Sequence, residues 1–477
     1  MILPSERDIE IFQNELSRGI EQFTFSINSK MSEKKQIEVL NNILNTEHSV
    51  FILATPQYLS IPRNDIDTII VENESANSYK MFTYPYLDFR TFIEVYAQNT
   101  KTKLILADTI LRFETLGRRE EFSEIRPLSF RLNFNGEIKL GEENIEEEKK
   151  KFKLFSEENI EEIKQILEKK QNVFVFSLRK GLATQTVCQD CKEILMCDEC
   201  SAPIVLYLSR DGKKRMFICN RCSTEKETLM TCPNCESWNL TPLGTGTDTV
   251  SEELEKYFPA DKIFKIDKTI AKTEKGAEKI VKDFEKEKGA ILIGTEMAFF
   301  YMKENVSLSV ISSFDSLWSI PNFKMSEKII HIIFSLINIT RDKIIIQTKN
   351  EKDDCLIAVK NDNLLNFVRD ELQDRKNLDY PPYKRFIKII HIGNREDTIV
   401  AKKYLADLFA GYDVKIFSAF ISRIKGQYVT NTLIKIEPAK WSLPQISLGS
   451  HIDKDLSKKL SSLSREFTIN VDPEDLL

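Results

Sequence analysis

The cysteines constrain this chain more than any other feature of its sequence. Eight of the nine lie between Cys188 and Cys235, and all eight form Cys-x-x-Cys pairs. Each pair turns two thiolates toward one point, and two pairs complete a tetrahedral zinc site. A disulfide framework is the main alternative, but the absence of a visible export signal disfavours it. A redox role for one pair is also open, although four neighbouring pairs favour metal.

The segment between the two inner pairs indicates how the pairs combine. It holds two apolar runs on either side of Asp211-Gly212, a typical hairpin turn. A hairpin there brings the inner pairs together and leaves the outer pairs to each other. We therefore predict two nested zincs whose closed coordination makes them structural. The ligands are Cys188, Cys191, Cys232 and Cys235 for the first zinc, and Cys197, Cys200, Cys219 and Cys222 for the second.

The charge of this cysteine segment predicts its partner class. Residues 188–243 hold seven Lys/Arg and eight Asp/Glu, and each four-thiolate zinc adds about −2. The segment is therefore acidic and should mainly contact protein. Its hairpin tip alone is basic and is either a nucleic-acid contact or a solvated loop. The basic residues of the tip are Arg210, Lys213, Lys214 and Arg215.

Composition places the whole chain among globular proteins. Its net charge of −5 confines any nucleic-acid contact to local patches. The most apolar window, residues 329–340, is too short to span a bilayer and is expected to be a buried helix or strand. No export signal is visible, so the cytoplasm is the expected compartment.

Hydrophobic periodicity predicts an α/β fold. Residues 1–120 and 156–350 alternate amphipathic helices with short apolar strands, which is typical of parallel sheets with crossover helices. The charged stretch 121–155 is interpreted as a solvated connector, and residues 188–243 as a zinc-binding insertion in the second α/β domain. Residues 351–477 are expected to form a small α+β domain.

One apolar run ends in a group of acids. The stretch TIIVENESANSYK, residues 68–80, places Glu72, Asn73 and Glu74 directly after a strand. The carboxyl end of a parallel strand is where α/β folds often hold catalytic or metal-binding acids. The group is therefore either a working acid motif or a relic of one.

Several stretches resemble one family in the order of that family. They are FSLRKGLATQTVCQDC, PLGTGTDTVSEELEKYFP, ILIGTEM, SIPNFKMSEK, ELQDRKNLDYPPYKRF and INVDPEDLL. These stretches resemble primosomal protein N′ (PriA), the replication-restart helicase family. The resemblance implies two RecA-like lobes with ATP between them, a double zinc module in the second lobe, and a small C-terminal domain. It also implies action on stalled forks with single-strand-binding protein and helicase-loading primosome proteins.

The chain departs from that family wherever ATP chemistry is expected. No G-x-x-x-x-G-K-[ST] phosphate loop occurs, and Met1 to Pro4 resemble the strand that follows this loop. The family's N-terminal fork-binding domain is therefore expected to be absent. Glu72 stands at the position of the metal-binding Asp, Asn73 replaces the Glu that activates water, and Ser75 replaces a His. Glu72, Asn73 and Glu74 are thus predicted to be relic positions with no catalytic role.

Other motifs differ as well. Residues 106–110 replace the family's Gly-Ser-Ala-Thr-Pro, and FFYMKE replaces Lys-Gly-x-Asp-Phe. Where the family carries an arginine finger, Arg341 is nearby but displaced. Loss of the phosphate loop, base and finger together leaves no credible ATP hydrolysis, so ATP and Mg²⁺ are not expected as cofactors.

Candidate DNA contacts rest on the same resemblance. Aromatic and basic side chains suit single strands, although surface residues with solvated charges are an equal alternative. The candidates are Tyr79, Lys80 and Arg90 after the acid motif, and Arg423, Lys425 and Tyr428 in the C-terminal domain. The GTGT turn, residues 244–247, is expected to precede a helix capped by Thr247 or Asp248 rather than to bind phosphate. Cys355 and the four histidines are expected to be structural.

Three functions follow from these observations. The first is a zinc-containing restart protein that binds forked or single-stranded DNA and primosome partners without hydrolysing ATP. The second is an active 3′-5′ helicase whose phosphate loop comes from a separate chain. The third is a zinc-stabilised scaffold that binds only proteins.

Overall fold

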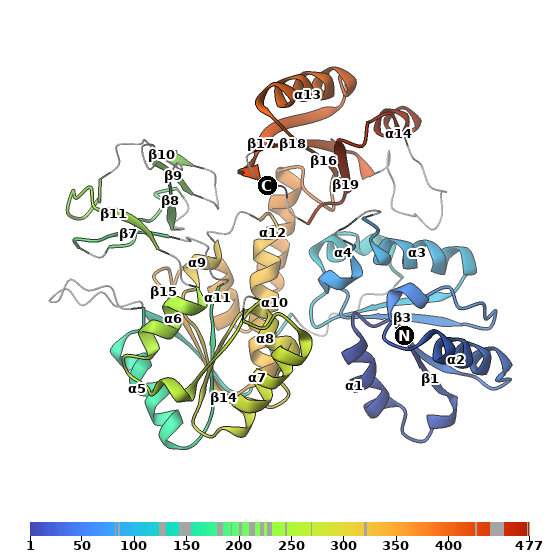
Figure 1. The fold of residues 1–477 in the computed structure, drawn as a ribbon, viewed down its shortest axis with the longest axis horizontal. Helices are drawn as coiled ribbons and strands as arrows, with labels where there is room; N and C mark the ends of the chain where they lie inside the picture. The colour runs from blue at the N-terminus through green and yellow to red at the C-terminus, as the bar shows by residue number, and fades with distance from the viewer. Residues whose placement is uncertain are drawn as a thin grey trace. The chain divides into compact units, whose positions relative to one another are not determined.

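The computed structural model (Figure 1) divides the chain into two compact units, which are described separately. The first comprises Met1–Arg126 with Asp370–Leu477, and the second comprises Pro127–Arg369. The structure describes all residues except 82, 84–85, 124–129, 143–153, 179–184, 192, 200–202, 209–214, 220–223, 227–230, 244–245, 269, 319–321, 425–426, 439–452, 475 and 477.

The N-terminal part of the first unit is built on parallel strands. Strands β1 (Thr24–Ile27) and β2 (Phe51–Ala54) pair with each other, as do β3 (Thr68–Glu72) and β4 (Lys103–Ala107). Ile2 forms parallel bridges to both Ala54 and Val71, so it joins the two pairs into one sheet. The helices of this part are α1 (Glu6–Leu16), α2 (Glu33–Asn45), α3 (Phe89–Thr100) and α4 (Phe113–Gly117). The expected parallel α/β architecture is therefore present.

The C-terminal part of the first unit is a four-stranded antiparallel sheet with two helices. The strand order is β17-β18-β16-β19. The elements are β16 (Arg385–Gly393), α13 (Arg395–Leu408), β17 (Asp413–Ile424), β18 (Gln427–Ile436), α14 (Lys454–Ser461) and β19 (Phe467–Val471). Apolar residues of both helices pack with β16 and β18 in one core, including Ile387, Leu405 and Leu456. This part therefore combines helices with an antiparallel sheet, and the domain bounds 351–477 stay a prediction.

The second unit contains a six-stranded parallel sheet in the order β12-β13-β6-β14-β15-β5. The contacts of strand β6 show that helices pack on both faces of this sheet. Val173 and Val175 belong to a core shared with α5 and α6. Phe174 and Phe176 contact Phe299 of α8. Successive side chains of a strand point to opposite faces, so helices cover both. The strands are β5 (Glu137–Glu142), β6 (Val173–Phe176), β12 (Ile263–Ile266), β13 (Ile291–Gly294), β14 (Val306–Ile311) and β15 (Thr340–Thr348).

The helices of the second unit surround this sheet and include the most apolar window of the chain. They are α5 (Glu157–Glu168), α6 (Thr247–Leu254), α7 (Glu274–Lys286), α8 (Glu296–Tyr301), α9 (Asp315–Trp318), α10 (Met325–Ile339) and α11 (Asp354–Lys360). Helix α12 (Leu365–Asn377) begins in the second unit and continues into the first. The apolar window lies almost wholly in α10, most of which is buried, as expected. No helix among the described residues is long and apolar enough to cross a membrane.

Strand β5 differs from the prediction for residues 121–155. We expected a solvated connector there, but β5 pairs with β15 along its whole length. Its sequence, EIKLGE, is half charged, and an edge strand needs few apolar residues because one side remains open. Strand β5 was therefore not recognised in this charged part of the sequence.

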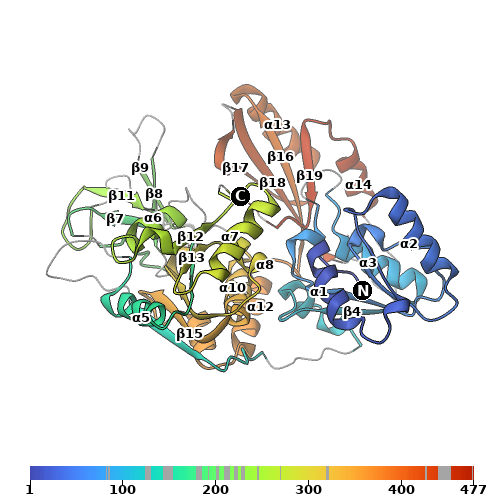
Figure 2. The same cartoon turned by 60° about the horizontal axis from the view of Figure 1, so that its bottom comes forward.

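The cysteine segment forms its own small sheets at one end of the second unit (Figure 2). Strand β7 (Gln185–Cys188) pairs with β11 (Leu240–Leu243), and β8 (Ile204–Leu208) pairs with β9 (Arg215–Cys219), which also meets β10 (Glu225–Lys226). The two apolar runs pair as antiparallel strands β8 and β9, as predicted, and the Asp211-Gly212 turn between them lies outside the described residues. The insertion is thus a set of short antiparallel strands attached to a parallel α/β unit.

Candidate functional site

The outer cysteine pairs meet in one compact cluster. The sulfur atoms of Cys188, Cys191, Cys232 and Cys235 all lie within 4.8 Å of one another. Cys188 Sγ is 3.5 Å from Cys235 Sγ, and Cys191 Sγ is 3.4 Å from Cys232 Sγ. A zinc tetrahedron with Zn–S bonds of about 2.3 Å has S–S edges of about 3.8 Å. None of the four is in a disulfide, so the cluster has the composition and dimensions of a site that can hold a metal ion.

The backbone of each outer pair points N–H groups at a sulfur. Burial raises the pKa of the Cys188 thiol, but hydrogen bonds from the N–H groups of Cys191 and Asp190 outweigh it and bring this pKa down to about 7. In the other pair, N–H groups of Cys235 and Asn234 donate to Cys232, but burial outweighs them and raises the pKa of this thiol to about 12. These donors stabilise thiolates, the form that binds metal.

The second predicted zinc site is only partly within the described residues. Cys197 and Cys219 are buried, and Cys219 ends strand β9 opposite Ile204 of β8. Cys200, Cys222 and the tip residues Arg210, Lys213 and Lys214 lie outside the described residues, and Arg215 is described by its backbone alone. The inner site therefore stays a prediction.

The acid motif is folded back into the protein. Asn73 adopts φ +52°, a left-handed conformation that asparagine tolerates better than most residues. Its carbonyl accepts the N–H of Ala76 at 2.9 Å. The position that would carry a catalytic base thus makes a tight turn, and this turn directs Glu74 inward.

Glu74 is fully buried, and its carboxylate makes hydrogen bonds within the protein. It accepts Arg112 Nε at 2.8 Å, the Arg112 N–H at 3.0 Å and Thr115 Oγ1 at 2.5 Å. Burial alone would raise the pKa of Glu74, but the Arg112 guanidinium and these hydrogen bonds hold it below its usual value. Arg112 and Thr115 were not predicted, because no local pattern links them to a residue so distant in sequence.

Glu72 is the more accessible acid. It is half-buried at the carboxyl end of β3. Burial, followed by the charges of Asp108 and Asp8, raises its pKa. Asp108 also accepts the Ser75 N–H at 2.7 Å, so the altered coupling motif supports the turn. The described residues contain no group of acids with metal-ligand spacing here; the outer cysteines are the cluster found.

Arg341 lies at the wrong end of its sheet to act as an arginine finger. It is the second residue of β15, which begins at the amino edge of the parallel sheet. Its guanidinium pairs with Asp342 and donates to Ser307 Oγ. The carboxyl edge, where parallel α/β folds bind ligands, is roughly 23 Å farther along the strand at about 3.3 Å per residue. Arg341 is therefore not a displaced version of the finger.

The three candidate DNA contacts after the acid motif are buried. Tyr79, Lys80 and Arg90 have exposed fractions of 0%, 3% and 3%. Tyr79 Oη donates to the carbonyls of Glu72 and Ile2. The alternative that they are a surface tyrosine and two solvated cations is wrong.

Lys80 and Arg90 bind the end of the C-terminal sheet. Lys80 Nζ donates to the carbonyl of Val471 at 3.2 Å and to that of Asp472. Arg90 pairs with Asp88 at 2.8 Å and with Glu474 at 3.4 Å. These positions favour a role in holding the first unit together, and a DNA contact would require both side chains to leave these partners.

The remaining candidates are less informative. Lys425 lies outside the described residues, Arg423 is described by its backbone in β17, and Tyr428 is half-buried opposite Arg423 in β18.

The expected helix after the GTGT turn is α6, but its N-cap is Gly246, one residue earlier than predicted. Thr247 instead donates to buried Asp267 at 2.7 Å. Cys355 is buried, as expected of a structural residue.

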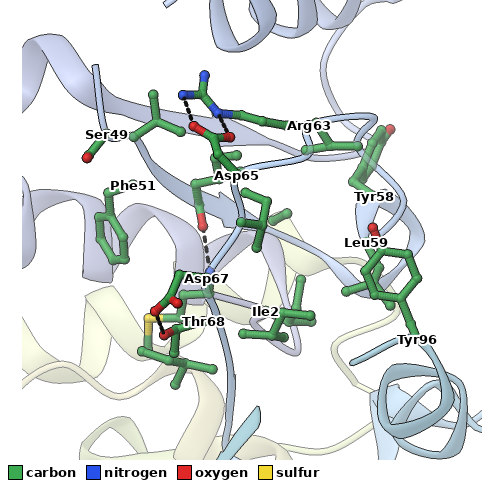
Figure 3. Close-up of a pocket in the computed structure, with 18 residues that line it drawn as sticks. Ile2, Ser49, Phe51, Tyr58, Leu59, Arg63, Asp65, Asp67, Thr68 and Tyr96 are labelled. Atoms are coloured by element: carbon green, nitrogen blue, oxygen red, sulfur yellow. Dashed lines mark hydrogen bonds and ion pairs between the residues drawn. The ribbon is translucent and has the colours of Figure 1, made fainter. Parts of the chain in front are cut away.

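The first unit also contains a cavity of about 350 Å³. Figure 3 shows it between Phe51, Tyr58, Leu59 and Tyr96, with the Arg63–Asp65 ion pair at its rim. Its walls come from the first residues of β2 and β3 and from Met1, at the amino edge of the sheet. The acid motif lies at the opposite edge, so this cavity is not part of it.

The chain is therefore an α/β protein with parallel sheets and an inserted four-cysteine cluster that can hold a metal ion. Its relatives include replication restart proteins PriA of several bacteria at 24–26% identity, which supports its placement as a divergent member of the PriA family. It is 26% identical to replication restart protein PriA of Borreliella burgdorferi over 384 residues, covering 79% of this chain and 57% of the relative. The corresponding protein of Thermotoga maritima is 24% identical over 432 residues, covering 89% and 56%.

The similarity is limited in extent and degree. The chain spans about half the length of these relatives, as it does for PriA of Bacillus subtilis, at 26% identity over 48% of that protein. No family model matches the chain. Among solved structures, it is similar to a hypothetical ATP-dependent RNA helicase from Sulfolobus tokodaii, with 12% identity, 74% and 80% of the two chains covered, and a TM-score of 0.25.

Proposed function

We propose that this chain is a replication-restart protein that binds forked or single-stranded DNA and primosome partners, carries two structural zincs, and does not hydrolyse ATP. Its expected protein partners are single-strand-binding protein and helicase-loading proteins, because these accompany the family it belongs to. The curated relatives bear the name replication restart protein, which supports the process.

The positions of Asn73 and Glu74 in the acid motif are the main support for the absence of ATP hydrolysis. A water-activating carboxylate must be free to accept a proton close to the bound phosphate. Here an amide, Asn73, occupies that position and forms a turn, while Glu74 is buried against Arg112 and Thr115. Neither group is available to activate water.

The carboxyl edge of the second unit supports the same conclusion. Asp315 is buried and accepts Thr348 Oγ1 at 2.8 Å and the N–H of Lys349 at 2.7 Å. Gly294 of the ILIGTEM stretch has a packing role, since a Cβ there would lie 2.8 Å from the Cβ of Ala298. Asp315 and Gly294, two of the described residues at this edge, are thus engaged with the protein.

Zinc would serve as a structural centre in this proposal. Cys188, Cys191, Cys232 and Cys235 would hold the first ion, and Cys197, Cys200, Cys219 and Cys222 the second. A zinc with four thiolates has no open position for water or substrate, so it supplies folding energy rather than chemistry. Cys188 is the last residue of β7, which pairs with β11, and Cys219 is the last residue of β9, which pairs with β8.

Replacing Lys80 with methionine tests which role this side chain has. We expect fork affinity and its salt dependence to stay unchanged, because Lys80 is buried against two carbonyls. We also expect faster amide exchange at residues 467–474, since a lost charged hydrogen bond costs about 1.5–3 kcal/mol. Fluorescence anisotropy with forked DNA and hydrogen exchange measure the two effects. A salt slope reduced by about one would instead assign Lys80 a phosphate contact.

Two alternatives make different predictions. An active helicase that obtains its phosphate loop from a separate chain would gain DNA-stimulated ATPase when mixed with that chain. A scaffold that binds only proteins would show no salt-sensitive binding of forked DNA at nanomolar protein. Anisotropy of labelled forked DNA over a range of salt therefore tests the DNA-binding part of the proposal, and we expect affinity to fall steeply as salt rises.

A further inference from the structure

The outer cysteine pairs are tied together by one side chain that is not a ligand. Asp190 lies between the ligands Cys188 and Cys191. Its Oδ1 accepts Asn239 Nδ2 at 2.9 Å, and its Oδ2 accepts the hydroxyl of Ser237. Ser237 and Asn239 follow the last ligand, Cys235, by two and four residues. The carboxylate of one pair thus holds the chain that leaves the other pair.

Backbone contacts place Asp190 at the centre of this arrangement. The N–H of Asp190 donates to the sulfur of Cys188. The neighbouring N–H of Gln189 donates to the carbonyl of Asn239 at 2.8 Å, and Ser237 accepts the N–H of Cys232 at its carbonyl. Asp190 therefore contacts the ligand Cys188 directly. It also hydrogen-bonds the segment 237–239, which follows the ligands Cys232 and Cys235.

We propose that Asp190 is a positioning residue for the outer metal site, and that its carboxylate slows release of the metal by holding the two cysteine pairs in register. This inference rests on the zinc assignment in the proposed function. Groups that orient metal ligands typically change metal affinity by 10–100-fold when they are removed. Asp190 is exposed, which weakens its hydrogen bonds, so we expect an effect near tenfold.

The competing explanation is charge alone. A carboxylate near four thiolates attracts a cation whatever its hydrogen bonds are. Asp190→Asn removes the charge but keeps the shape and one accepting oxygen, so positioning predicts that it retains most of the metal affinity. Asp190→Ala removes both, and a double-mutant cycle with Asn239→Ala isolates the contact between the two side chains.

Asn234 offers a control at the matched position. It stands between Cys232 and Cys235 as Asp190 stands between Cys188 and Cys191, and its backbone N–H points at Cys232 in the same way. Asn234→Ala keeps that backbone donor and should leave metal release unchanged. The inner zinc of the same chain is a second control, because Asp190 lies outside its ligand set.

The experiment follows transfer of zinc from the full zinc-loaded chain to a chromogenic chelator. For Asp190→Ala we expect one of the two zincs per chain to transfer about tenfold faster, with the second unchanged. With cobalt in place of zinc, the thiolate-to-cobalt absorption of the outer site should weaken at limiting metal. Asn239→Ala should add little to Asp190→Ala.

Three results would overturn the inference. Transfer from Asp190→Ala at the wild-type rate would show that the carboxylate does not hold the site. Equal acceleration of both zincs would indicate general loss of the module fold. A wild-type chain that binds no metal after zinc loading would refute the zinc assignment itself, whereas wild-type zinc binding without an Asp190 effect would refute only the positioning role.

Discussion

Glu74→Ala is expected to destabilise the first unit by about 3–5 kcal/mol, because it leaves the Arg112 guanidinium buried without its counter-charge. The variant also removes the acceptor for Thr115 Oγ1 and the Arg112 N–H. Hydrogen exchange over residues 68–80 and 103–117 measures the loss locally, which avoids assuming two-state unfolding of a chain with several parts.

Glu72→Gln is the matched control in the same motif. The folded pKa of Glu72 is raised by burial, Asp108 and Asp8, so its ionisation opposes folding above that pKa. The variant should therefore be slightly more stable than wild type at pH 7, and the gain should vanish below the unfolded pKa of 4.5. The opposite holds for Glu74, whose lowered pKa gives stability that is lost as pH falls through it. A harmless Glu74→Ala would contradict this account of the motif.

Removing zinc is expected to have the second large effect. Structural zinc sites in peptides contribute about 10–16 kcal/mol of apparent binding energy at neutral pH, more than short strands such as β7 and β11 can replace. A chelator should therefore release about two zincs per chain and expose the amides of residues 185–243. Metal analysis and hydrogen exchange follow these changes.

Single cysteine variants make that prediction specific. Cys232→Ser alters a buried sulfur of the outer cluster and should lower the zinc content to about one per chain. Cys355→Ala changes a buried cysteine far outside the cluster in sequence and should keep both zincs. A full zinc complement in Cys232→Ser would contradict the ligand assignment.

The parallel α/β architecture and the outer cysteine site followed from the sequence because both depend on short-range patterns. Buried strands such as VFVF are continuous apolar runs, and a Cys-x-x-Cys spacing fixes local geometry. The antiparallel pairing of β8 and β9 followed from two apolar runs on either side of Asp211-Gly212. Strand β5 was missed because its edge position requires few apolar residues.

The roles of single polar residues were harder to predict. Glu74 was predicted to be a relic position without a catalytic role, but its buried partners Arg112 and Thr115 lie 38 and 41 residues away and were not foreseen. Lys80 and Arg90 appeared to be solvated or DNA-binding, but they contact residues near the C-terminus. Such contacts depend on tertiary packing, which no periodicity or spacing encodes.

We propose above all that this chain binds forked DNA without using ATP. The most direct measurement is phosphate release by the zinc-loaded chain with saturating forked DNA, with binding followed by anisotropy in the same sample. We predict salt-sensitive binding and phosphate release no faster than without protein. DNA-stimulated phosphate release that is lost in Glu72→Gln would contradict the account and restore the acid motif as a catalytic site.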